Sequence, residues 1–114
     1  MTARHKHGAI RTVVDGITFP SKLEAKRYGE LKLLMKAGLI SKLEMQPSFV
    51  LAPSVVLGGR KKPPLRYVAD YRYVDTATGL SVVEDCKGQV LPMYRAKAHL
   101  MKHLYNIDIV EVRR

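Results

Sequence analysis

The 114-residue chain has one cysteine, no tryptophan and no long apolar run. The single cysteine, Cys86, excludes an internal disulfide, which fits the reducing environment of a cytoplasm. No run of 18 apolar residues occurs, so the sequence predicts no transmembrane helix. The basic N-terminus has no apolar segment behind it and is not expected to be a secretory signal. These absences favour a cytoplasmic protein with no membrane partner.

Acidic residues are also scarce. Ten Asp and Glu stand against 20 Lys and Arg, which leaves a net charge of +10. Such an excess favours a polyanionic partner, with nucleic acid first and an anionic membrane surface second. A membrane role ranks last because the sequence lacks a basic amphipathic helix with a strong apolar face.

The length and the apolar content predict one folded domain. Hydrophobic residues make up 46% of the chain, which is enough for one core. We expect residues 13–114 to form this domain and residues 1–12 to form a flexible basic arm. Arg4 and Lys6 of the arm are candidates for phosphate contacts, and a merely flexible arm is the alternative reading.

Periodicity and turn signals predict the order of the elements. Asp15-Gly16 favours a short hairpin over 13–19, and Ser21 with Glu24 has the spacing of a capping box that opens a helix ending at Gly38. Residues 39–51 read as a strand region in which Pro47 marks an edge or a bulge. The remaining predictions are a loop over 53–64, strands over 65–74 and 80–87, a helix over 93–105 and a strand over 107–112.

These elements predict an α/β fold. The short turn at 76–79 makes the strands around it an antiparallel hairpin. The last strand follows a crossover helix and should therefore lie parallel to its neighbour. We expect a mixed sheet of about four strands flanked by helices.

The stretch that carries chemistry is 80–87. Strand alternation places Asp85 and Lys87 on one face and Glu84 and Cys86 on the other. Asp70 lies on the paired strand, so the carboxylates of Asp70 and Asp85 can meet around one cation, and Mg²⁺ suits such a pair. We expect Glu84 to be a structural partner of Arg72 or of another cation, although a bulge near Gly88 would exchange the roles of Glu84 and Asp85.

Asp70 followed by Glu84-Asp85-Cys86-Lys87 resembles the PD-(D/E)XK nuclease signature. The runs at 16–28, Gln46-Pro47 and 84–88 are similar to a family of small phage-encoded proteins placed in this superfamily as endonucleases. The resemblance covers about residues 8–112 and departs from the signature at Ala69, where proline is the usual residue. It implies a restriction-endonuclease-like core with the order αβββαβ.

The resemblance also implies roles for the site residues. Asp70, Asp85 and the backbone carbonyl of Cys86 would be metal ligands, and Glu24 would reach the metal through water or directly. Lys87 would orient the attacking water or offset charge in the transition state. Plainer readings remain: Glu24 as a capping residue only, and Asp85 with Lys87 as a surface ion pair.

Further polar residues are candidates for contacts with the nucleic acid. Three consecutive cations lie in the predicted loop over 53–64, and two residues one turn apart lie on the second predicted helix. Gln46 is a candidate for orienting water or contacting the substrate backbone. The DNA-binding candidates are Gln46, Arg60, Lys61, Lys62, Tyr94 and Lys97, together with Arg4 and Lys6.

The expected function is therefore a DNA endonuclease dependent on Mg²⁺ or Mn²⁺, encoded by a phage or prophage and acting in the cytoplasm of the bacterial host. A Holliday-junction resolvase and a nicking or replication-recombination nuclease are the options within this class. Cutting two strands requires two active sites, which favours a homodimer. The alternative is a non-catalytic nucleic-acid-binding module whose acidic cluster is only structural.

Overall fold

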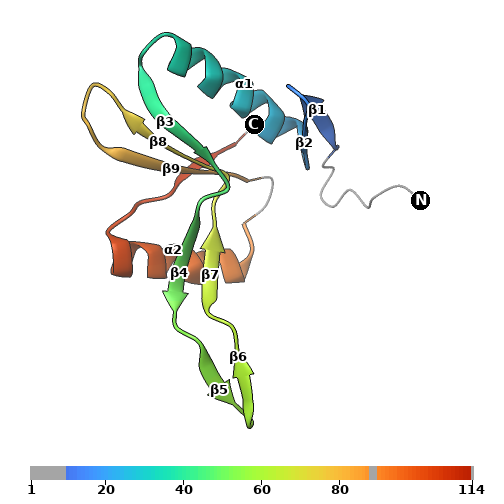
Figure 1. Ribbon diagram of the computed structural model, residues 1–114, viewed down its shortest axis with the longest axis vertical. Helices are drawn as coiled ribbons and strands as arrows, with labels where there is room; N and C mark the ends of the chain where they lie inside the picture. The colour runs from blue at the N-terminus through green and yellow to red at the C-terminus, as the bar shows by residue number, and fades with distance from the viewer. Residues whose placement is uncertain (1–9, 88–89, 114) are drawn as a thin grey trace.

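A computed structural model describes residues 10–87 and 90–113 (Figure 1). Its centre is a mixed four-stranded sheet with the strand order β10-β9-β8-β3. The strands are β3 (Ile40–Met45), β8 (Tyr71–Asp75), β9 (Ser81–Cys86) and β10 (Val110–Val112). The pairs β3–β8 and β8–β9 are antiparallel, whereas β10 lies parallel to β9. The expected α/β class, the mixed sheet and the parallel final strand are therefore confirmed.

The two helices lie where the sequence predicts them. Helix α1 covers Lys22–Lys36, and the hydroxyl of its N-cap Ser21 accepts a hydrogen bond from the Glu24 N–H at 3.2 Å. Helix α2 covers Pro92–Tyr105 and ends at Asn106 in a left-handed conformation. Before α1, strands β1 (Thr12–Val14) and β2 (Ile17–Phe19) form the expected hairpin around Asp15-Gly16.

Each face of the sheet has its own apolar core. The first core contains Tyr28 and Leu31 of α1 with Tyr71 and Tyr73 of β8. The second contains Tyr94 and Met101 of α2, and Val83 of β9 packs there while Val82 packs against the first core. Since neighbouring residues of a strand point to opposite faces, α1 and α2 cover the two sides of the sheet.

The strands predicted over 39–51 and 65–74 are each divided in two. Strand β4 (Ser48–Ala52) pairs antiparallel with β7 (Leu65–Val68), outside the main sheet. The breaks face each other, because the Gln46 N–H donates to Asp70 O at 2.9 Å and the Ala69 N–H donates to Pro47 O at 3.0 Å. The break that Pro47 predicted is thus matched by a second break next to Asp70.

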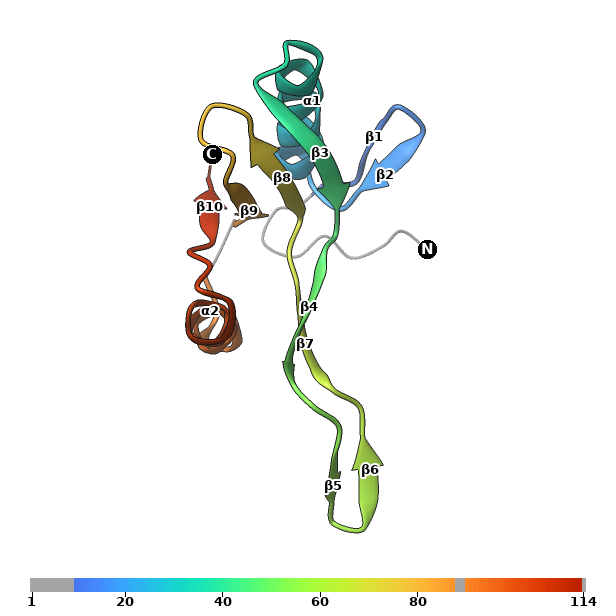
Figure 2. The same ribbon diagram turned by 60° about the vertical axis from the view of Figure 1, so that its left-hand side comes forward.

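The loop prediction over 53–64 is wrong. Strand β5 (Val55–Leu57) pairs with β6 (Arg60–Lys62) across the two-residue turn Gly58-Gly59. Both glycines have a positive φ, 59° and 78°, which is the backbone conformation that a tight hairpin turn requires. The density of Gly and Pro suggested an irregular loop, but the glycines form the turn and the prolines stand outside the paired residues. In Figure 2 the ribbon from β4 to β7 projects away from the body of the molecule.

Some predictions fall outside the described residues. These are the flexible state of residues 1–9 of the predicted arm, the contacts of Arg4 and Lys6, and the bulge considered near Gly88. Strand β9 itself ends at Cys86.

Candidate active site

Asp70 lies at the junction where the chain leaves the ribbon after β7 and enters the main sheet at β8. Its N–H donates to Glu84 O at 3.1 Å, and its Oδ2 accepts a hydrogen bond from the Cys86 N–H at 2.6 Å. The break between β7 and β8 therefore places the carboxyl of Asp70 beside the end of β9. Sequence pairing predicted this neighbourhood, and the structure confirms it.

Asp85 and Lys87 share the face of β9 that α2 covers. Lys87 Nζ lies 3.0 Å from Asp85 Oδ2 and 3.9 Å from the centre of the Tyr94 ring. Asp85 is buried and also accepts a hydrogen bond from the hydroxyl of Tyr67. The predicted common face of Asp85 and Lys87 is thus confirmed, but their ion pair is largely enclosed and is not an exposed surface pair.

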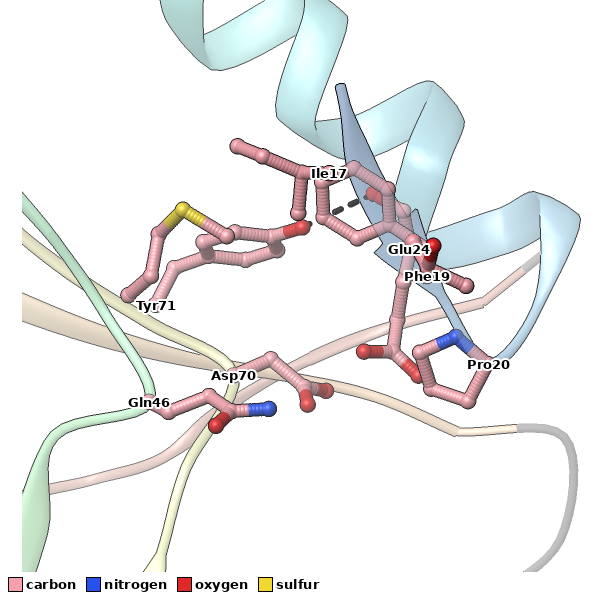
Figure 3. Close-up of a pocket in the computed structure, with 9 residues that line it drawn as sticks. Ile17, Phe19, Pro20, Glu24, Gln46, Asp70 and Tyr71 are labelled. Carbon is pink, nitrogen blue, oxygen red and sulfur yellow. Dashed lines mark hydrogen bonds between the residues drawn. The ribbon is translucent and has the colours of Figure 1, made fainter. Parts of the chain in front are cut away.

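Glu24 approaches the same cluster from the N-terminal turn of α1. Figure 3 shows its carboxyl facing that of Asp70 across a pocket, with the side chain of Gln46 pointing into the same space. The pocket has a volume of about 230 Å³, and residues of β2, α1, β3 and β8 line it. The Tyr71 hydroxyl donates to the backbone oxygen of Glu24 at 2.8 Å, which ties this turn of α1 to the sheet. Glu24 is therefore a member of the acidic cluster as well as a residue of the capping turn.

The cluster is electrostatically strained. Burial, the neighbouring Asp85 and the charge of Glu24 raise the pKa of Asp70 to about 9. Burial is also the main cause that raises the pKa of Glu24, with Asp85 contributing. Ionising all of these neighbouring carboxyl groups is unfavourable because their negative charges repel. The cluster therefore retains a proton or requires a cation. Lys87 is the cation that the described residues place beside Asp85.

Glu84 points to the opposite face of the sheet, as alternation predicted, and it serves a structural role. Arg27 Nε and Nη2 donate to its two carboxylate oxygens at 2.8 and 2.6 Å, and the Tyr73 hydroxyl is a further donor. The expected partner was Arg72 or another cation; the partner is the other cation, Arg27, whereas Arg72 pairs with Glu44. The side chain of Arg27 is 22% exposed and that of Glu84 1%, so this ion pair is largely enclosed.

The described residues do not form a ready-made metal site. Within 10–87 and 90–113, no three His, Cys, Asp or Glu side chains are placed so that they could hold one ion. The donor set itself suits Mg²⁺ or Mn²⁺, because carboxylate oxygens crowd together and the pKa values of Glu24 and Asp70 are raised. Tyr67 and Lys87 both contact Oδ2 of Asp85, so a cation bound through that oxygen would compete with them.

The DNA-binding candidates lie at three separate places. Gln46 lines the pocket beside Asp70. Tyr94 is buried against Lys87 and its hydroxyl donates to Glu111 Oε2 at 2.9 Å, so it supports Lys87 and is poorly placed to contact a phosphate. Lys97, one turn further along α2, is partly exposed. Arg60, Lys61 and Lys62 form the exposed strand β6 in the projecting ribbon.

Two residues that hold the cluster in place, Tyr67 and Glu111, were not predicted from the sequence. Tyr67 bonds to Asp85, and Glu111 bonds to Tyr94. The alternating tyrosines at 67, 71 and 73 were a usable signal, because buried tyrosine hydroxyls need polar partners. Cys86 packs partly buried against the first core, and burial raises the pKa of its thiol far above the usual range, which is typical of a packed cysteine and not of a reactive one.

The chain belongs to a family described as "Protein of unknown function (DUF1064)", whose model matches residues 4–112. No curated protein and no solved structure matches the chain. In the described part of the chain, neither helix has the length and apolar character needed to cross a membrane.

Proposed function

We propose that the protein is a metal-dependent DNA endonuclease of the PD-(D/E)XK superfamily, encoded by a phage or prophage and acting in the host cytoplasm. The observation that carries the proposal is the meeting of Glu24, Asp70 and Asp85 beside Lys87 in a chain of net charge +10. A protein that only binds polyanions gains nothing from three crowded carboxyls. A cation site next to a phosphodiester explains both the acidic cluster and the basic surroundings.

The order of the main elements supports the same proposal. When the two side ribbons are left out, the helices and sheet strands follow one another as α1, β3, β8, β9, α2 and β10. This is the αβββαβ order that the resemblance implies for a restriction-endonuclease-like core. Asp70 directly precedes the second strand of this series, Asp85 lies near the end of the third, and Lys87 directly follows it.

The residues divide the chemistry among them. Asp70, Asp85 and the Cys86 carbonyl would hold Mg²⁺ or Mn²⁺, and Glu24 would bind it directly or through water. When bound, the ion supplies a polarised phosphoryl oxygen and a more acidic water. Lys87 keeps a positive charge beside the reacting phosphate, and the Tyr94 ring beneath its ammonium fixes that position.

A non-catalytic nucleic-acid-binding module is the second candidate. It is favoured by the bonds that Tyr67 and Lys87 already make to Asp85, because an ion pair of this kind is stable without a metal. In this case the cluster would only hold α1, β8 and β9 together.

The deciding experiment is incubation with labelled linear, nicked, flap and four-way-junction DNA in Mg²⁺, Mn²⁺ or EDTA. We expect cleavage of at least one substrate in the metal buffers and none in EDTA. Asp70→Asn and Asp85→Asn should keep the fold and abolish cleavage, because each amide is nearly isosteric but lacks the charge. The matched control is Asp108→Asn, which changes an exposed carboxylate paired with Lys102. Cleavage at the wild-type rate by either site variant would refute the assignment.

A further inference from the structure

The ribbon of residues 48–68, here called the β-arm, has no structural partner in the described part of the chain beyond its base. Strands β5 and β6 at its tip pair only with each other. The radius of gyration is 16.0 Å and the longest extent is 51 Å, whereas a compact domain of about 100 residues has a radius of gyration near 13 Å. The arm is the part that departs from compactness (Figures 1 and 2).

The tip of the β-arm exposes apolar side chains that the fold does not use. Val55, Val56 and Leu57 are 51%, 71% and 66% exposed. An isolated two-stranded hairpin is marginally stable in water, and three exposed apolar residues do not help it. A contact outside this fold explains their presence better than folding does.

The charge of the β-arm has one sign. Residues 45–69 contain no Asp or Glu, and they include the cations Arg60, Lys61, Lys62 and Arg66. The arm therefore offers nothing acidic to the arm of a second copy, and two tips side by side would repel. A polyanion complements it.

The pairing register gives each face of the tip both kinds of side chain. Val56 lies opposite Lys61, and Leu57 lies opposite Arg60. Because alternate residues point to opposite faces, these two pairs occupy the two faces of the ribbon. In a DNA groove, cations reach phosphates at the rim while apolar side chains approach the base edges and thymine methyl groups.

We propose that the β-arm is a groove-binding ribbon for double-stranded DNA. The major groove is about 12 Å wide and admits a two-stranded β-ribbon. This inference rests on the proposed function only in taking DNA as the partner. The tip binds the duplex away from the acidic cluster. The β-arm therefore contributes to the affinity for DNA and not to the chemical step.

The test is a binding titration on a 30-base-pair duplex in Ca²⁺ over a series of salt concentrations. R60A/K61A/K62A should weaken binding tenfold or more and flatten the plot of log affinity against log salt by about 2.7, at roughly 0.9 per phosphate contact. The matched control, K26A/K32A/K36A, removes the same charge from helix α1. It should change both quantities much less.

A second variant separates groove insertion from simple phosphate attraction. V56S/L57S keeps every charge, so it should weaken duplex binding several-fold, leave the salt slope unchanged and spare binding to a single-stranded oligonucleotide. Equal losses in the arm and control triple variants would overturn the proposal, as would unchanged duplex binding by V56S/L57S. A lower sedimentation mass for V56S/L57S with unchanged DNA affinity would also overturn it, in favour of a contact between copies.

Failure of the arm and failure of the nuclease assignment remain distinguishable. Arm variants that bind normally would refute the groove ribbon whatever the cleavage assay shows. Loss of duplex binding in the arm variants would support the ribbon even if no DNA were cut in Mg²⁺ or Mn²⁺.

Discussion

At the residue scale, the effect of replacing Lys87 distinguishes the proposed nuclease from a protein that only binds nucleic acid. Its ammonium is held between Asp85 and the Tyr94 ring, beside the carboxyl cluster and not on an exposed face. Interactions that strengthen in the transition state raise the chemical rate, while equal binding of both states does not. We expect Lys87→Ala to bind DNA within a few-fold of wild type in Ca²⁺ and to cleave about 10²-fold more slowly in single turnover in Mg²⁺.

The matched comparison is Lys97→Ala, which removes a cation on the same helix as Tyr94; within residues 10–87 and 90–113 no hydrogen bond or salt bridge joins Lys97 to the cluster. This variant should weaken binding and leave the single-turnover rate of the bound complex intact. The opposite pattern, with affinity lost at Lys87 and an unchanged rate, would move the assignment to the binding module.

The acidic cluster also predicts how stability depends on pH. Burial raises the pKa of Asp70 from 3.8 to about 9, so the folded chain holds a proton that the unfolded chain releases above about pH 4. The free energy of unfolding should therefore fall as the pH rises from about 4 to 9 in EDTA. Asp70→Asn should flatten this fall, because its amide does not ionise.

Urea titrations at pH 5, 7 and 9 measure the effect, with Asp108→Asn as the exposed control. An equally steep fall in Asp70→Asn would show that another group holds the proton. Added Mg²⁺ should restore stability at pH 9 in the wild type and not in Asp70→Asn, since a ligand that binds only the folded state stabilises it.

Residue-level prediction succeeded where strand alternation decides direction. Because side chains alternate along a strand, Asp85 and Lys87 were predicted on one face and Glu84 on the other, and the structure confirms this arrangement. Prediction from the sequence failed for the contacts of a long side chain. A charged side chain such as Arg27 is usually exposed on a helix. Here it binds the buried carboxylate of Glu84, 57 positions away in the sequence, and no local sequence pattern predicts that contact.

At the element scale, the Arg27–Glu84 pair fixes α1 on the sheet and so places Glu24 one turn earlier in the cluster. Removing one partner of a buried pair leaves an uncompensated charge. Glu84→Ala should therefore lower the free energy of unfolding by about 3 kcal/mol. The exposed pair of Glu44 with Arg72 is the control, and Glu44→Ala should cost less than about 1 kcal/mol.

Chemical denaturation of both variants measures the difference. Equal costs would show that α1 is held by its apolar face alone. A further consequence is that Glu84→Gln, which keeps the volume and one of the two acceptor oxygens, should lose less stability than Glu84→Ala.

The ends of an element could be predicted where a capping residue or a turn residue marks them in the sequence. They could not be predicted where two paired strands are interrupted at facing positions. Ser21 and Gly38 bounded α1 correctly. The break at 69–70 has no local signal, because Tyr67, Ala69, Tyr71 and Tyr73 keep perfect alternation across it. Yet Tyr67 and Ala69 pack in the core beside α2, while Tyr71 and Tyr73 pack beside α1. The facing break at Gln46-Pro47 turns both strands out of the sheet together.

At the scale of the whole molecule, the sequence predicted the class of the sheet but not the shape. Helix and strand order follow from periodicity, and the parallel last strand follows from its crossover. The projecting β-arm could not be predicted, since its Gly and Pro residues are equally typical of a loop. The pairing of β4 with β7 and that of Val55–Leu57 with Arg60–Lys62 make it a ribbon.

The last prediction concerns the number of protomers on the DNA. A cut through both strands needs two sites, whereas protomers of net charge +10 repel each other in free solution. DNA neutralises that charge, so we expect pairing to be far stronger on a four-way junction than in its absence. Sedimentation velocity should show mainly monomer without DNA at low salt and two protomers on each junction in Ca²⁺. One protomer per junction at saturation, with cleavage confined to one strand, would instead identify a nicking enzyme that acts alone.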